Sequence, residues 1–198
     1  MRHIIFFMGG KTMNHLDYEI NKELGECYLF MGDLDKAETY YRKAVNSAGE
    51  YPDSYLGLAT IAVQRGQLDN ALTLYRKAVD KNGGDKAMTG VGLVCMEQGE
   101  HNEAMGYFEN ALTVNPSNNI ALNCLVREAY SQNCVDRIVP TLEACLAANP
   151  DNEAYRITLA GCLVTLGRQE QAKDHLQSVL AANPASQNAR DLYEHIAA

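Results

Sequence analysis

A short pattern recurs along the chain at a nearly constant interval, and it restricts the fold more than any other feature. A glycine is followed five residues later by an alanine in four segments, which start at Gly32, Gly66, Gly99 and Gly167. These glycines are 34, 33 and 68 residues apart, and because 68 is twice 34, one further copy is expected before the last. Asn133 lies 34 residues after Gly99, and asparagine is the non-glycine residue that best tolerates a positive φ. The chain therefore contains five repeats, each about 34 residues long.

Each repeat contains two predicted helices. In the first copy Leu24, Cys27 and Met31 are spaced by three and four residues, and Ala37 and Tyr41 by four, which is the spacing of one face of a helix. The glycine between the two stripes marks the turn that separates the helices. Seven residues before the turn most copies carry a small residue, which allows two helices to cross closely: Gly25, Ala59, Gly92 and Ala160.

Start and stop signals frame the second helix of each repeat. Polar residues three positions after the turn are predicted to be N-caps: Asp35, Asp69, Asn102 and Asp136. Asn-Pro pairs at 115–116, 149–150 and 183–184 are predicted to end the second helix, since proline cannot continue the hydrogen-bond ladder. Pro140 is expected in the first turn of its helix, where a missing N–H is tolerated.

This frame resembles the tetratricopeptide repeat family. The matching residues are Leu24-Gly25-x-x-Tyr28, Ala104-x-x-x-Phe108 and Pro116. The resemblance implies an all-α, right-handed superhelical solenoid of antiparallel helix pairs, with repeats at 18–51, 52–84, 85–118, 119–152 and 153–186. Residues 187–198 then form a capping helix in which Leu192, Tyr193 and Ile196 face back, and residues 1–17 are an N-terminal extension. No copy has the family's common Trp, and the fourth lacks both Gly and Ala at its turn.

Composition excludes several classes of protein. Asp and Glu total 25 against 17 Lys and Arg, so the net charge is -8 and nucleic acid is an unexpected partner. Unbroken apolar runs such as Ile4–Met8 and Cys27–Met31 reach only five residues, whereas a membrane span needs about 20 and a signal peptide core about 7–15. Residues 85–118 carry a net charge of -4, which either steers a basic partner or is a solvated face.

The cysteines indicate a reducing compartment. Six of them are scattered without a C-x-x-C pair, and most lie in apolar helical stretches, so we expect free, buried thiols and a cytoplasmic protein.

Signals for catalysis are weak. The segment Gly9-Gly10-Lys11-Thr12 is similar to the end of a phosphate-binding loop, but Ile5 stands where the full motif needs glycine. The five histidines, His3, His15, His101, His175 and His195, include no i,i+4 pair and no H-E-x-x-H. We therefore predict no catalytic residue, no metal and no cofactor. A nucleotide-binding or enzymatic role for the N-terminal segment is kept as the alternative of another class.

In the family that the chain resembles, the first helix of each repeat lines a concave groove that holds a peptide or a partner helix. Carried over by position, this groove comprises Lys22, Glu26, Leu56, Thr60, Val63, Thr89, Leu93, Met96, Asn123, Arg127, Tyr130, Ile157 and Val164, together with Leu29 and Gly161. Members that grip a chaperone's C-terminal carboxylate use Lys and Asn here, whereas Glu26 replaces the Asn in this chain. The alternative for Leu56, Leu93 and Ile157 is packing between repeats.

The sequence thus predicts a non-enzymatic interaction scaffold or adaptor that binds a protein or peptide and does not insert into membranes. Self-assembly is a second alternative, since some members of the family, including one associated with magnetosomes, are thought to oligomerise. The apolar segment Ile4–Met8 is expected to cover the open edge of the first repeat or to dock on another molecule, with Gly9-Gly10 as a flexible joint.

Overall fold

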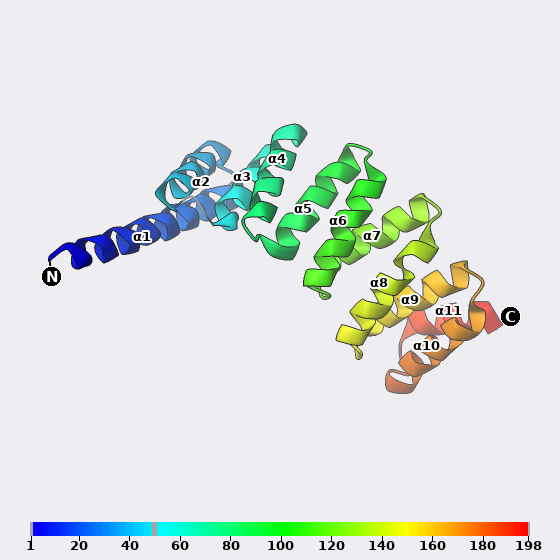
Figure 1. Ribbon diagram of the computed structural model, residues 1–198. Helices are drawn as coiled ribbons and strands as arrows, with labels where there is room; N and C mark the ends of the chain where they lie inside the picture. The colour runs from blue at the N-terminus through cyan, green and yellow to red at the C-terminus, as the bar shows by residue number, and fades with distance from the viewer. Residues whose placement is uncertain (1, 49–50, 198) are drawn as a thin grey trace. The chain divides into compact units, whose positions relative to one another are not determined.

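The computed structural model describes the backbone of residues 2–48 and 51–197 and the side chains of residues 14–47 and 51–196. These residues form eleven α-helices and no strand (Figure 1). The prediction of an all-α fold is therefore confirmed. The chain divides into two compact units, Met1–Tyr107 and Phe108–Ala198, and the division falls inside one helix.

The helices of each unit follow one another as antiparallel pairs. Unit 1 contains α1 Arg2–Phe30, α2 Leu34–Ala48, α3 Pro52–Gln64, α4 Leu68–Asp80, α5 Gly84–Glu97 and the first half of α6 His101–Val114. Unit 2 contains the rest of α6, then α7 Asn119–Ser131, α8 Val135–Ala148, α9 Glu153–Thr165, α10 Gln169–Ala182 and α11 Gln187–Ala197. The last helix, α11, contacts α10 and α9. Of the three residues expected to face back, Ile196 is buried, and Leu192 and Tyr193 are half-buried.

The turn inside each pair depends on one residue with a positive φ. Gly32, Gly66, Gly99 and Gly167 have φ between 72° and 81°. Asn133 has φ 52°, which confirms that asparagine takes the place of glycine in the fourth copy. The Asn-Pro pairs at 115–116, 149–150 and 183–184 directly follow the ends of α6, α8 and α10, which confirms them as stop signals.

The predicted N-caps are wrong by two residues. Asp35, Asp69, Asn102 and Asp136 are each the second residue of their helix, because the helix begins two residues after the positive-φ residue. In the first turn, the negative charges of the three aspartates interact favourably with the positive end of the helix dipole. Side chains that do accept from the first turn are those of Asp33, Asn118 and Asn152, which bind the amides of Lys36, Ala121 and Tyr155.

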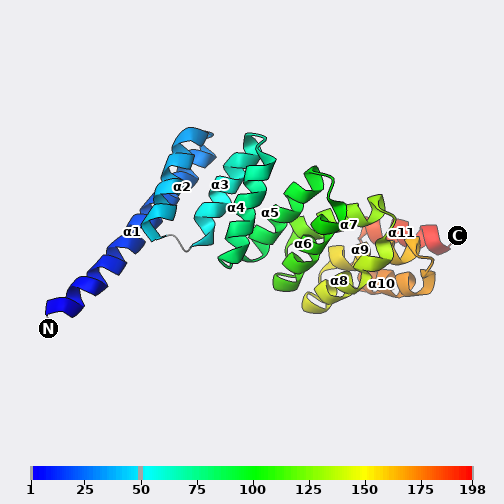
Figure 2. The same cartoon turned by 45° about the horizontal axis from the view of Figure 1, so that its top comes forward.

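Two further predictions about helices are corrected. Pro140 lies in the second turn of α8, not the first, so its missing N–H removes one bond from the helix interior. Residues 2–17 continue the helix of the first repeat, so Gly9-Gly10 is helical and not a flexible joint (Figure 2). A segment inside the same straight helix also cannot fold back over the edge formed by that helix. The side chains of residues 1–13 lie outside the described part.

Aromatic rings set against glycines are part of the core of unit 1. Tyr41 is buried between Gly25 of α1 and Gly57 of α3, and a Cβ atom at either glycine would clash with its ring. Tyr75 contacts Gly90 of α5 in the same way. Burial raises the pKa of Tyr41 to about 12. The contacts between consecutive pairs therefore require positions without a side chain.

Polar side chains also join consecutive pairs. In unit 1, the Arg65 guanidinium lies 2.5 Å from Asp35 and 2.5 Å from Glu38 of the preceding pair. In unit 2, the Tyr155 hydroxyl donates to Asn119 Oδ1 over 2.9 Å. These contacts fix how one pair is rotated against the next.

All six cysteines are free thiols. Four are buried, which confirms the prediction for Cys95, Cys124, Cys145 and Cys162. Burial raises the pKa of these four thiols and so lowers their reactivity. Cys134 is half-buried and Cys27 is exposed.

Candidate binding surface

The first helices of successive pairs form the inner layer of unit 1. Cα atoms of α1 come within 8 Å of α3, and those of α3 within 8 Å of α5, whereas α2 and α4 make no such contact over their described residues. Because α1, α3 and α5 lie closer to one another than α2 and α4 do, they occupy the concave side of the unit. The predicted groove residues of unit 1 all come from these three helices.

The α1 part of this layer is acidic. Lys22 Nζ lies 2.7 Å from Glu19 Oε2, which raises the pKa of Lys22 and leaves its charge neutralised. Glu26 is exposed and has no hydrogen bond or ion pair among the described residues. A carboxylate of a ligand would meet repulsion from Glu26 here and find Lys22 already paired.

Residues from α3 and α5 are mostly apolar and half-buried. Val63 is exposed, and Leu56, Thr60, Leu93 and Met96 are half-buried. Their partial burial means that they pack between helices and also contribute to the surface.

One predicted groove residue lies inside the unit. Thr89 is only 5% exposed, and its hydroxyl donates to the Asp85 carbonyl over 2.7 Å. The Thr89 side chain therefore hydrogen-bonds within its own helix and has little surface that a ligand could contact.

In unit 2 the predicted residues lie on α7 and α9. Asn123, Arg127 and Tyr130 are exposed on α7, while Ile157 and Val164 are half-buried on α9. Asn123, Arg127 and Tyr130 are spaced by four and three residues, so they share one side of α7.

Tyr130 is fixed against α9. Its hydroxyl is hydrogen-bonded to Thr165 Oγ1 at 3.2 Å, and burial raises its pKa. The side chain is still 42% exposed. At Gly161 an added Cβ would meet only the Tyr130 hydroxyl, at 3.9 Å, so open space remains beside the ring. A fixed aromatic wall next to an open position is a suitable place for a ligand side chain.

Two large exposed apolar side chains were missed. Ile120 lies on α7 three residues before Asn123, whereas Phe30, which is 94% exposed, follows Leu29 directly and so points to a different side of α1. The helical period contains the signal for Ile120, because residues three apart share one side of a helix.

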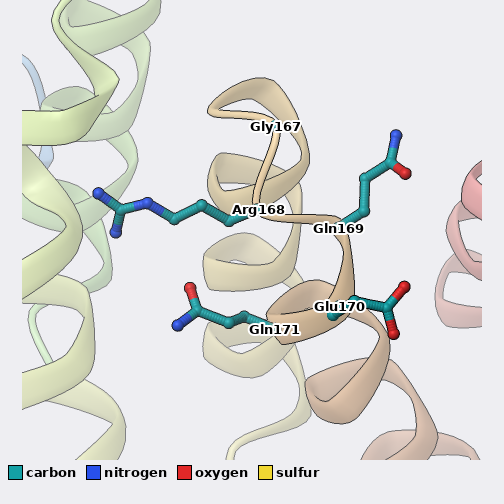
Figure 3. A pocket seen from close by; sticks show the side chains of 5 residues that line it. All are labelled: Gly167, Arg168, Gln169, Glu170 and Gln171. Atoms are coloured by element: carbon teal, nitrogen blue, oxygen red, sulfur yellow. The ribbon is translucent and has the colours of Figure 1, made fainter.

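The hollows in the surface do not resemble catalytic sites. One of about 540 Å³ lies at the turn between α9 and α10 and is lined by Gly167, Arg168, Gln169, Glu170 and Gln171. Arg168 and Gln171 project to one side of the turn, and Gln169 and Glu170 to the other, so their polar groups do not converge (Figure 3).

A second hollow, of about 390 Å³, lies beside α9 and α10, and two of the charged side chains that line it, Glu153 and Arg156, already have hydrogen-bond partners. Arg156 donates to the Pro150 carbonyl over 2.6 Å, and Glu153 accepts from Asn183 and Ser186. Their partners are side chains or carbonyls of the same unit.

Other signals for chemistry are also weak. No three His, Cys, Asp or Glu residues in the described part come together in a way that could hold a metal ion. The Gly9-Gly10-Lys11-Thr12 segment has a helical backbone, not the loop that would cradle a phosphate. Over the described residues no helix has the length and apolarity needed to cross a membrane.

Comparison with protein families identifies the repeat directly. Three models described as tetratricopeptide repeat match residues 18–81, 56–120 and 129–196, and together they span most of the chain. Comparison with curated proteins gives no match for this sequence.

Several solved structures share the fold. PilF of Pseudomonas aeruginosa superposes with a TM-score of 0.63 at 18% identity, covering 92% of this chain and 90% of PilF. A MamA protein superposes with a TM-score of 0.61 at 17% identity, covering 83% of this chain and 91% of the MamA chain. YrrB superposes with a TM-score of 0.60 at 15% identity, covering 88% of this chain and 90% of YrrB. It is described as a TPR protein with an unusual peptide-binding site. At these identities the likeness shows the fold and nothing finer.

Proposed function

Because the chain belongs to the tetratricopeptide repeat family, we propose that it is a non-enzymatic scaffold that holds a segment of another protein against its inner layer. The peptide-binding site named for YrrB supports a peptide as the bound form. The six free thiols fit a reducing compartment, and we place the scaffold in the cytoplasm on that basis.

The observation that carries this proposal is the exposure of Tyr130 beside the open position at Gly161. Tyrosine and arginine contribute a large share of binding energy at protein interfaces. Tyr130 and Arg127 lie one turn apart on α7, so a single ligand can contact both. The inner side of α7 and α9 is therefore the proposed binding surface of unit 2.

The test is a selection from a phage-displayed library of random 16-residue peptides on the full chain. Selected peptides are then measured against a double variant, Arg127→Glu with Tyr130→Ala. We expect at least a tenfold loss of affinity, since removing an interface anchor costs more than about 1 kcal/mol. Circular dichroism should show unchanged helical content, because both side chains are exposed.

The matched control is Glu143→Arg, a charge reversal at an exposed position of α8. It should leave the affinity unchanged. Full affinity in the double variant would contradict the proposal and move the site away from α7. Failure of any peptide to enrich would contradict peptide binding itself.

A further inference from the structure

One side of α1 is exposed along about four turns. We call the free face of α1 the side formed by Leu16, Ile20, Glu23, Cys27 and Phe30. Their spacings of four, three, four and three residues place them in one stripe, about 21 Å long. All five are exposed, with Leu16 at 60%, Ile20 at 47% and Phe30 at 94%. Most of this stripe is apolar, which is unusual for a face left in water.

The middle of this face is covered in the first helices of the later pairs, whereas the residues that correspond to Phe30 are exposed there as well, namely Gln64, Glu97 and Thr165. Counted by repeat position, Ile20, Glu23 and Cys27 correspond to three residues in each of α3, α5 and α9. Eight of those nine residues are buried and Thr158 is half-buried: Ser54, Gly57, Ile61, Ala87, Gly90, Val94, Tyr155, Thr158 and Cys162.

In unit 1 the cover is the preceding helix pair. Tyr41 packs on Gly57, and Ile61 shares a cluster with Ala37 and Tyr41. The middle of the free face, from Ile20 to Cys27, therefore has the position and register of a surface that holds other helices.

Glu23 makes this face chemically different from its counterparts. In α3 and α5 the position is glycine and admits an aromatic ring. In α1 a carboxylate stands at the centre of the stripe, with Asp17 and Glu26 exposed at its sides. Over the described residues neither Glu23 nor Glu26 has an ion pair, and Lys22 is bound to Glu19 at 2.7 Å. The face is an apolar stripe with an uncompensated negative charge.

We propose that the free face of α1 binds a basic amphipathic helix of another protein. Its apolar side would cover Leu16, Ile20 and Phe30, and its Lys or Arg side chains would meet Glu23 and Glu26. Opposite charges across the contact would steer association and fix the register. This surface is the edge of the first pair, separate from the Tyr130 site of unit 2.

A second copy of the chain fits this face less well. Two free faces placed against each other would bring Glu23 and Glu26 of both copies together, and like charges across an interface are unfavourable. Stacking on the last pair of another copy is opposed by α11, which already contacts α10 and α9. Charge therefore favours a basic partner over self-association.

The probe is an acetylated 18-residue peptide with leucine at heptad positions a and d and lysine at e and g. Its counterpart carries glutamate in place of lysine. By fluorescence anisotropy with the full chain, we expect the lysine peptide to bind at least tenfold more tightly than the glutamate peptide. The variant Glu23→Lys with Glu26→Lys should lower the affinity for the lysine peptide at least tenfold. Ile20→Asp should lower the affinity for both peptides.

Cys27 provides a readout at the site itself. Its thiol is exposed on the free face, so bound lysine peptide should slow alkylation of Cys27 by iodoacetamide at least fivefold. The half-buried Cys134 lies in unit 2 and should react at the same rate with and without peptide.

The matched control is Glu170→Lys with Glu194→Lys, which makes the same charge change on exposed helices of unit 2. An equal loss of lysine-peptide binding in this control would mean non-specific attraction and would overturn the proposal. Unprotected Cys27 in the peptide complex would overturn it as well. A free chain that sediments as a dimer, and becomes a monomer with Ile20→Asp, would assign the face to a second copy instead.

Discussion

Consecutive helix pairs are joined differently in the two units. In unit 1 the ring of Tyr41 fills a slot between Gly25 and Gly57, so the contact depends on shape in addition to the ion pairs of Arg65 with Asp35 and Glu38. In unit 2 the contact between α7 and α9 depends on hydrogen bonds, from Tyr155 to Asn119 and between Tyr130 and Thr165. A slot without side chains rejects almost any substitution, whereas a half-exposed hydrogen bond can be replaced by water. Unit 1 should therefore be much less tolerant of change at these contacts.

The largest expected effect is that of Ala104→Trp in unit 1. Ala104 has no exposed surface, and a new indole there must displace the neighbouring helices. We expect a loss of about 3 kcal/mol or more in the free energy of unfolding, since overpacking typically costs about 1–3 kcal/mol. His101→Ala, at the start of the same helix, should cost less than about 1 kcal/mol. Equal urea denaturation curves for the two variants would contradict the claim that close packing makes unit 1 intolerant of larger side chains.

Gly57→Val tests the slot directly. The Tyr41 ring cannot move away from a new side chain, because Gly25 closes its other side. We expect a loss of about 2–3 kcal/mol from strain in the core. Thr158→Val alters the corresponding position of α9 and should cost less than about 1 kcal/mol. Denaturation monitored by circular dichroism compares the two, and a larger effect at Thr158 would reverse the comparison.

Tyr155→Phe measures what a hydrogen bond contributes in unit 2. It removes the 2.9 Å bond to Asn119, which is exposed and can bind water instead. The expected cost is about 1 kcal/mol. A double-mutant cycle with Asn119→Ala measures the interaction energy between the two side chains. An interaction energy near zero would mean that this hydrogen bond does not stabilise unit 2.

The smallest expected effect is a pH dependence in unit 2. Hydrogen bonds from Asn183 and Ser186 hold the pKa of Glu153 below its ordinary value of 4.5. A lowered pKa in the folded state stabilises the fold at pH above 4.5, and this contribution disappears as the pH falls through the folded pKa. Between pH 6 and pH 3.5, the melting temperature should fall further in the wild type than in Glu153→Gln. An identical fall in both would exclude this contribution.

The repeat frame was readable from the sequence because it depends on local backbone needs. Gly32 and Asn133 occupy turns that require a positive φ, and Pro116 follows a helix end, so residue type alone indicated each. The N-caps were misplaced because aspartate is favoured both at the cap and in the first turn.

The surface was harder to predict because exposure depends on neighbouring helices. Thr89 and Tyr130 were both predicted to lie at inner positions, on α5 and α7, yet one is buried and the other exposed. Cys27 and Ile61 occupy corresponding positions of α1 and α3, one exposed and one buried, because among the described residues only Ile61 has a helix pair in front of it. A single sequence does not contain the distances that decide these outcomes.

The most direct test of an inner binding surface is hydrogen exchange of the full chain with a bound library-selected peptide. Backbone amides exchange more slowly where a ligand suppresses local opening. We expect slower exchange in α7 and α9, at residues 119–131 and 153–165, and unchanged exchange in α8 and α10. Protection confined to α8 and α10, with none in α7 or α9, would contradict an inner binding surface.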